Sequence, residues 1–203
     1  EESDGSVSGY SPEVGVVLNI DRDHHELDKL LAMFSSFCEK TTGTLVLAAD
    51  CSNTSELDLS RSSAQIVSFG IDCPTADYRA ENIIQSPLST SFSVGNTRLE
   101  SPLPGRYNVY NVLAALAACE AVGVERKEFA RVLPGFKGIE RRFQLVGEAN
   151  GVNVIDDFAH NPAKIEAVMG AFSAWKKLGR LIVVFQPHGY GPTRFFRREL
   201  VEI

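Results

Sequence analysis

Two adjacent carboxylates and a histidine directly follow an apolar segment near the middle of the C-terminal third of the chain. Residues 152–155 are typical of a strand, and Asp156, Asp157 and His160 come after it. Asn161 and Pro162 are then suited to be the N-cap and first residue of a helix. Ligands of open α/β sheets bind at such strand ends. The alternative is that the two acids only cap the helix, and this segment alone does not decide.

A second acidic cluster, Asp-Arg-Asp-His at residues 21–24, follows the apolar run 14–20. Carboxylate oxygens and neutral imidazole are common ligands of divalent cations, so Asp21 and His24 could hold a cation or its waters. A solvated helix start explains the same spacing and is favoured by the spacing alone.

Two further clusters contain amides and guanidinium groups. Asn108 and Asn111 lie three positions apart in GRYNVYN, where they could cap a helix or present amides to a ligand. GIERRF, residues 138–143, carries paired arginines whose guanidinium groups suit phosphate binding or an ordinary ion pair. FQPHGYGPTR, residues 185–194, places His188 after another apolar segment.

Composition excludes several classes of protein. The 203 residues carry a net charge of −6, which argues against a nucleic acid or an anionic membrane as the main partner. A phosphorylated small molecule held by local cations stays possible. No apolar run approaches the roughly 20 residues of a membrane span, and no signal peptide is visible. The four scattered cysteines form no C-x-x-C pair and indicate free thiols in a reducing cytoplasm.

The elements that must position these residues alternate between strands and helices. We expect near-continuous apolar strands, an amphipathic helix between the first two, and hence a parallel α/β sheet. An antiparallel patch should follow, turned at Gly95 and Asn96, and then a helix. The predicted strands are 14–20, 44–49, 65–69, 79–84, 91–94 and 97–99, and the predicted helices 27–40, 110–122 and 127–132.

The pattern changes near residue 143. A hairpin is predicted from residues 143–148 and 152–155, then a helix from 162 to 177 and a buried strand at 181–185. We therefore expect two domains, residues 1–143 and 144–203. The polar start and an end within a predicted helix indicate a fragment of a longer protein.

Taken together, DRDH, PGRYNVYN, GIERRF, DDFAHNP and FQPHGY resemble the ATP-dependent Mur ligases of peptidoglycan synthesis. The nearest branch acts on UDP-N-acetylmuramate and adds L-alanine or a whole murein tripeptide. The resemblance covers nearly the whole chain. It implies an α/β fold: the latter part of a central parallel-sheet ATPase domain, without its P-loop portion, followed by the start of a Rossmann-like C-terminal domain.

The resemblance implies a nucleotide and metal site. His24 matches the family histidine near the second Mg²⁺, and Asn108 and Asn111 match the pair that lines the ATP site. Arg142 matches the arginine that reaches the γ-phosphate across the domain junction. Asp157 matches the acidic position that contacts the nucleotide from the C-terminal domain.

His160 and His188 match residues on the substrate side of the cleft, and with Arg142 they form the expected catalytic set. The implied reaction turns a carboxylate into an acyl phosphate at the expense of ATP, and an amine then displaces phosphate. The implied cofactors are ATP and Mg²⁺. The implied partners are UDP-N-acetylmuramate and an amino acid or murein peptide, with no nucleic acid and no membrane.

The sequence also departs from the family pattern. A G-x-x-G-K-[ST] phosphate loop is absent, so the lysine and the hydroxyl of that loop lie before Glu1 or are lost. The Mg²⁺-binding glutamate of the family is expected just before Glu1. The chain alone is therefore expected to be inactive. Gly189 and Pro192 replace two arginines of the L-alanine ligases and leave Arg194, so the amine substrate is open.

Other functions are weaker alternatives. One is a non-catalytic nucleotide- or UDP-sugar-binding module that has lost its P-loop, and another is a Mur-like ligase with a different amine. A dinucleotide-dependent oxidoreductase is disfavoured because no G-x-G-x-x-G follows a strand. Folylpolyglutamate synthesis is disfavoured by DDFAHNP and FQPH.

Overall fold

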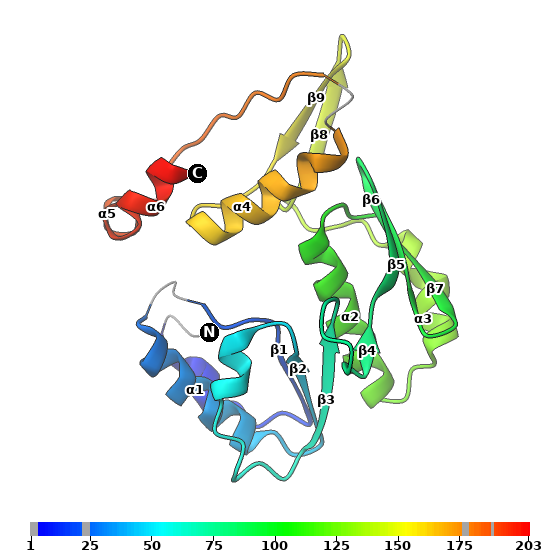
Figure 1. Cartoon of the computed structure of the whole chain (residues 1–203), viewed down its shortest axis with the longest axis vertical. Coiled ribbons are helices and arrows are strands. Elements are labelled where there is room, and N and C mark those ends of the chain that lie inside the picture. Colours follow the sequence, from blue (N-terminus) through cyan, green and yellow to red (C-terminus); the bar gives the residue numbers. More distant parts are fainter. Residues whose placement is uncertain (1–3, 22–24, 176–178, 188) are drawn as a thin grey trace.

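A four-stranded parallel sheet forms the N-terminal half of the chain, as the apolar strand pattern predicts (Figure 1). The computed structural model describes residues 4–21, 25–175, 179–187 and 189–203. The strands are in the order β1-β2-β3-β4 and pair in parallel throughout. Their bounds are β1 Val14–Val17, β2 Thr44–Ala48, β3 Gln65–Gly70 and β4 Tyr78–Arg79.

Both faces of β2 are buried, which explains its continuous apolar sequence. Alternate residues of β2 serve different cores: Leu45 and Leu47 pack with helix α1 (Leu27–Lys40), whereas Val46 and Ala48 face the core built on helix α2 (Arg106–Ala121). The sheet is thus held between two helices, as in other α/β domains.

A second, antiparallel sheet shares the core of α2. Its strands are β5 (Glu81–Ser86), β6 (Ser89–Val94) and β7 (Thr97–Ser101), and its inner side chains include Phe92 and Leu99. Helix α3 (Arg126–Val132) packs beside β7. The short 3-10 helices of this half are Ser6–Gly9, Ser52–Glu56 and Leu133–Gly135.

One strand boundary in this region differs from the sequence prediction. Residues 79–84 do not form one antiparallel strand, because Arg79 ends β4 and pairs with Gly70 of the parallel sheet. Asn82 then has a φ of 52°, and the pairing of β5 is irregular at this point. The left-handed residue therefore lies within β5, at the irregularity between Glu81 and Ile84, and the change from the first sheet to the second occurs before it, at Ala80.

The C-terminal half begins with the predicted hairpin. Strands β8 (Gln144–Ala149) and β9 (Val152–Asp156) pair antiparallel. Asn150 and Gly151 between them have φ values of 53° and 76°, as a tight hairpin turn requires. Helix α4 (Pro162–Ala171) is shorter than predicted and continues as the 3-10 turn Phe172–Trp175. Helices α5 (Tyr190–Phe195) and α6 (Arg197–Glu202) complete this half.

The predicted buried strand at residues 181–185 is wrong. These residues lie outside any strand, and Val184 is 94% exposed. In the described residues, β8 and β9 pair only with each other, so the segment has no neighbouring strand to bond to. The apolar run has a composition typical of a strand, but a strand forms only where another strand is available to pair with it.

The two halves touch along an aromatic seam. Phe143 is buried, and its ring centroid lies 4.9 Å from that of Phe172. The indole of Trp175 donates to the carbonyl of Pro87 at 2.8 Å, in the turn between β5 and β6. A Cβ on Gly105 would lie 2.9 Å from Ala171, so the start of α2 is packed closely against the end of α4. Among the described residues, no helix is long and apolar enough to cross a membrane.

Candidate functional site

Asn108 and Asn111 form one hydrogen-bonded pair at the start of α2. The side-chain amide of Asn108 donates to the carbonyl of Pro104 at 2.7 Å, and that of Asn111 donates to Asn108 Oδ1 at 3.1 Å. The helix begins at Arg106, and its N-cap, Gly105, makes no side-chain cap bond. The asparagines therefore do not cap the helix. Asn108 is buried and orients Asn111, which is exposed.

The acids after β9 do not cap the following helix either. Asn161 does so, since its Oδ1 accepts from the backbone N–H of Lys164 at 2.9 Å, and Pro162 is the first helical residue as predicted. Asp157 instead accepts from the backbone N–H of Phe143 and of Ala159, each at 2.7 Å. The carboxylate thus joins the end of β9 to the junction between the two halves.

Phe158 is the centre around which the predicted groups gather. The guanidinium carbons of Arg141 and Arg142 lie 4.6 Å and 5.8 Å from its ring centroid. The ring of His160 packs edge-on against it, with centroids 5.1 Å apart. The structure therefore brings together Arg142, Asp157 and His160, three of the predicted site residues, at the junction.

Backbone geometry sets the direction of Arg142. Its neighbours Arg141 and Phe143 have φ values of 58° and 47°, a left-handed conformation that is uncommon for residues with a side chain. Such strain persists only where surrounding contacts impose it, and here Asp157 holds the N–H of Phe143. Arg141 lies 3.5 Å from Asp156, whereas the guanidinium carbon of Arg142 lies 5.8 Å from the centroid of the Phe158 ring.

The hydrogen bond of His160 defines its neutral tautomer. Nδ1 lies 2.9 Å from the carbonyl oxygen of Phe158. A carbonyl only accepts, so Nδ1 must carry the proton, and the lone pair of the neutral ring is then on Nε2. The contact with the carbonyl of Phe158 holds the imidazole in one orientation.

Tyr107 is a candidate that the sequence analysis missed. Its hydroxyl is shielded from solvent and has no hydrogen-bond partner among the described residues. Burial, followed by the nearby charge of Asp157, raises the pKa of Tyr107 to about 12, so the phenol stays protonated. Tyr107 belongs to the GRYNVYN motif, but no feature of that motif predicts that the hydroxyl of this tyrosine is buried.

His24 and His188 lie outside the described residues, so their predicted roles stay predictions. Asp21, next to the first of them, is exposed. Within the part of the chain that is described, no group of three or more histidine, cysteine or acidic side chains is arranged to hold a metal ion. The predicted Mg²⁺ site therefore gains no support from the described residues.

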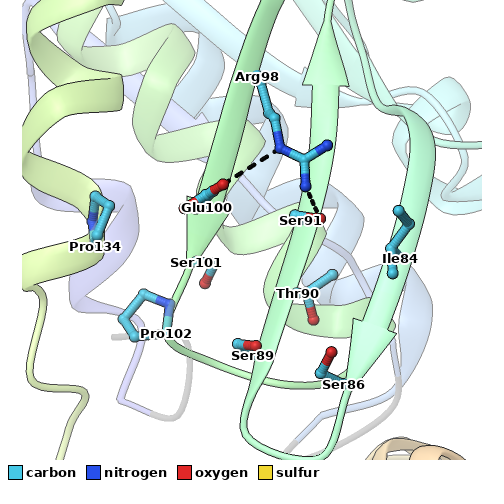
Figure 2. A pocket seen from close by; sticks show the side chains of 10 residues that line it. All are labelled: Ile84, Ser86, Ser89, Thr90, Ser91, Arg98, Glu100, Ser101, Pro102 and Pro134. Carbon is cyan, nitrogen blue, oxygen red and sulfur yellow. Dashed lines mark hydrogen bonds and ion pairs between the residues drawn. The ribbon is translucent and has the colours of Figure 1, made fainter.

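A hollow of about 350 Å³ lies elsewhere, on the three-stranded sheet (Figure 2). Arg98 spans part of it and contacts Ser91 at 3.0 Å and Glu100 at 3.3 Å. None of the predicted site residues lines this hollow. The candidate site is accordingly the junction around Phe158 and the start of α2.

Comparison with known proteins identifies the family. Residues 1–119 match the Mur ligase middle domain, and residues 141–202 match the Mur ligase, glutamate ligase domain. The chain belongs to the Mur ligase family. The two matched regions of this Mur ligase chain meet at the junction that carries Arg142 and Asp157.

Curated relatives are named UDP-N-acetylmuramate–L-alanine ligases. The Mur ligase chain is 37% identical to that of Geobacter sp. (strain M21) over 213 residues, which are 100% of this chain and 46% of the relative. It is 36% identical to that of Streptomyces avermitilis, over 98% of this chain and 46% of the relative. The chain thus spans about half the length of the curated relatives it matches.

Solved structures confirm the α/β fold class. MurC, the UDP-N-acetylmuramate–alanine ligase from Thermotoga maritima, has a TM-score of 0.76 at 23% identity, covering 99% of this chain and 51% of that chain. MurF from Acinetobacter baumannii has a TM-score of 0.74 at 24% identity, covering 85% and 40%. A murein peptide ligase from Psychrobacter arcticus has a TM-score of 0.63 at 26% identity, covering 84% and 37%.

Proposed function

We propose that the complete protein carrying this chain is an ATP-dependent ligase that joins the carboxylate of UDP-N-acetylmuramate to the amine of L-alanine. The observation that carries the proposal is the convergence of Arg142, Asp157 and His160 around Phe158, beside the asparagine pair of α2. Family membership and the names of the relatives that match the whole chain support the same reaction.

The chemistry explains why charged groups, rather than a protein nucleophile, are needed. A carboxylate is a poor acyl donor, so it is first converted to an acyl phosphate by ATP. The amine then attacks the carbonyl carbon, and phosphate leaves. Both steps move negative charge among phosphoryl oxygens, which a guanidinium stabilises through charge-assisted hydrogen bonds. We assign this task to Arg142, which lies at the junction beside Phe158.

The remaining residues would bind and orient the reactants. Asn108 and Asn111 would line the ATP site, with the protonated hydroxyl of Tyr107 as an additional donor beside them. Asp157 would contact the nucleotide from the C-terminal half while it holds the junction. We assign His160 and His188 to the substrate side of the site.

Mg²⁺ is part of the proposal through His24, which lies outside the described residues. The ion would neutralise negative charge on the phosphate groups of ATP. We further propose that residues 1–143 and 144–203 belong to two domains, that catalysis occurs between them, and that the protein acts in the cytoplasm without a nucleic-acid or membrane partner.

A second amine substrate is supported by one feature. Gly189 and Pro192 stand where L-alanine ligases carry arginines, and a solved murein peptide ligase shares the fold. A murein tripeptide is therefore the alternative acceptor.

Phosphate release by the complete protein tests the proposal. ATP, Mg²⁺ and UDP-N-acetylmuramate are combined with L-alanine, with other amino acids, or with the murein tripeptide. We expect L-alanine to stimulate release most. If only the tripeptide stimulates phosphate release, the tripeptide and not L-alanine is the amine substrate. If no amine stimulates release, the non-catalytic binding module is favoured.

A further inference from the structure

Asp50 gathers hydrogen-bond donors from two separate segments at the carboxyl end of β2. Its Oδ2 accepts from the backbone N–H of Ile71 at 2.6 Å and of Asp72 at 3.0 Å, and its Oδ1 accepts from the N–H of Cys73 at 2.7 Å. The fourth donor is the hydroxyl of Tyr110, on α2, at 2.8 Å from Oδ2. One side chain thus joins β2, the loop after β3 and the first turns of α2.

The backbone is adapted to this carboxylate. A Cβ on Gly70 would lie 3.0 Å and 3.1 Å from the two oxygens of Asp50, so a larger residue would crowd the carboxylate. Burial opposes ionisation of Asp50, but the hydrogen bonds from Ile71, Asp72, Tyr110 and Cys73 outweigh it and lower the pKa of the carboxyl. The carboxylate is therefore charged at neutral pH.

Tyr110 provides the matching donor. Burial, and then its hydrogen bond to Asp50, raise the pKa of Tyr110 to about 12, so the phenol is protonated at neutral pH. The bond between them is charge-assisted and stronger than one between neutral groups. A second connection runs parallel to it, since Arg106 pairs with Asp72 at 2.5 Å, although both of these side chains are exposed.

We propose that Asp50 is a positioning residue for the nucleotide site, acting through Tyr110 on the asparagines of α2. This inference rests on the proposed function. Tyr110 lies between Asn108 and Asn111 on α2, and its bond to Asp50 ties this turn of the helix to the loop after β3, in addition to the buried side chains of Val109 and Leu113. The amide of Asn108 is also held by the carbonyl of Pro104, so Asp50 and Tyr110 would act on the helical turn that carries the asparagines.

Tyr110→Phe is the decisive variant, because it removes only the hydroxyl. The loop after β3 keeps its three bonds to Asp50, so the fold is expected to survive. Tyr78→Phe is a matched control: the Tyr78 hydroxyl donates to Glu120 at 2.8 Å near the other end of α2, and burial, followed by Glu120, likewise raises its pKa to about 12. Both variants thus lose a tyrosine–carboxylate bond to or from the same helix.

Two measurements on the complete protein test the inference. In hydrogen exchange without ligand, Tyr110→Phe should speed exchange of the amides of residues 110–113, whereas Tyr78→Phe should leave them unchanged. In steady-state kinetics, Tyr110→Phe should raise KM for ATP about three- to tenfold, as expected for the loss of one hydrogen bond, with kcat within about twofold. Tyr78→Phe should alter neither constant.

The outcomes separate the two proposals. Equal effects of the two variants on exchange and on KM would overturn the positioning role and leave Asp50 as support for the sheet alone. If the unaltered protein neither binds nor uses ATP, the proposed function fails, while the exchange measurement still decides whether Asp50 fixes the first turns of α2.

Discussion

Arg142 carries the most specific chemical role among the individual side chains. Its neighbour Arg141 pairs with Asp156 at 3.5 Å, whereas Arg142 lies exposed at the junction, with its guanidinium carbon 5.8 Å from the centre of the Phe158 ring. In the proposed reaction it offsets charge that develops on phosphoryl oxygens. A side chain with that function contributes to the transition state more than to folding.

Replacing Arg142 by alanine in the complete protein should lower kcat by about 100-fold or more, the usual cost of removing a preorganised group that stabilises transition-state charge. Steady-state phosphate release measures the effect. Arg98→Ala is the control, since Arg98 is an exposed arginine of the three-stranded sheet that pairs with Glu100. Unchanged turnover in Arg142→Ala would refute the assigned role.

Loss of the Tyr107 hydroxyl should affect the free energy of unfolding differently from loss of a tyrosine hydroxyl that has a hydrogen-bond partner. The buried hydroxyl of Tyr107 has no partner in the described residues, so Tyr107→Phe should leave the free energy of unfolding unchanged or raise it by up to about 1 kcal/mol. Tyr78→Phe, which loses a bond to Glu120, should lower it by about 1 kcal/mol. Urea unfolding measures both. Equal losses would mean that the Tyr107 hydroxyl has a structural partner.

At the scale of elements, the hairpin of β8 and β9 is joined to the preceding turn by Asp157. Asp157→Ala should lower the free energy of unfolding by about 1–3 kcal/mol, because the N–H of buried Phe143 loses its acceptor. Asp156→Ala removes only an exposed ion pair with Arg141 and should cost less than about 1 kcal/mol. Denaturant titration compares the two, and similar costs would contradict the anchoring role.

The apolar segment 181–185 gives a second test at this scale. Because it is unpaired and exposed, its amides should exchange with deuterium much faster than those of β2, whose Val46 is fully buried. Hydrogen exchange followed by mass spectrometry on the chain of 203 residues measures both segments. Slow exchange at 182–184 would instead support the paired strand that the apolar pattern predicts.

At the scale of the whole molecule, the candidate site lies where two regions of the chain meet that match different Mur ligase domains. The start of α2 supplies Asn108 and Tyr107, and the segment after β9 supplies Asp157 and His160. Their approach depends on the aromatic seam between Phe143 and Phe172. Such a site can change shape when the halves move, and closure of that kind aligns reactants and excludes water.

The chain of residues 1–203 should not turn over ATP by itself, because it contains no G-x-x-G-K-[ST] loop to hold the phosphates. A phosphate-release assay with UDP-N-acetylmuramate and L-alanine measures this directly. Its positive control is the same assay on the complete protein. Ligation by the chain alone would show that the phosphates are held by other residues.

Local patterns were sufficient for most of the fold. Strand β2 was predicted within a residue because both of its faces are buried, so its apolar side chains are continuous. The turn at Asn150 and Gly151 and the cap at Asn161 were predicted because each depends on its own residue types. The strand predicted at residues 181–185 was wrong because a strand also requires a neighbouring strand to pair with.

The sequence by itself determined the family resemblance and the parallel sheet, and it predicted that Arg142, Asp157 and His160 belong to one site. Only the tertiary structure decided which N–H groups Asp157 accepts from, that the hydroxyl of Tyr107 is buried, and that Tyr110 donates to Asp50. The reason is the separation of the partners in the sequence: Asp157 comes 14 positions after Phe143, and Tyr110 comes 60 positions after Asp50. Helix and strand periodicities relate residues a few positions apart, so they contain no information on these contacts.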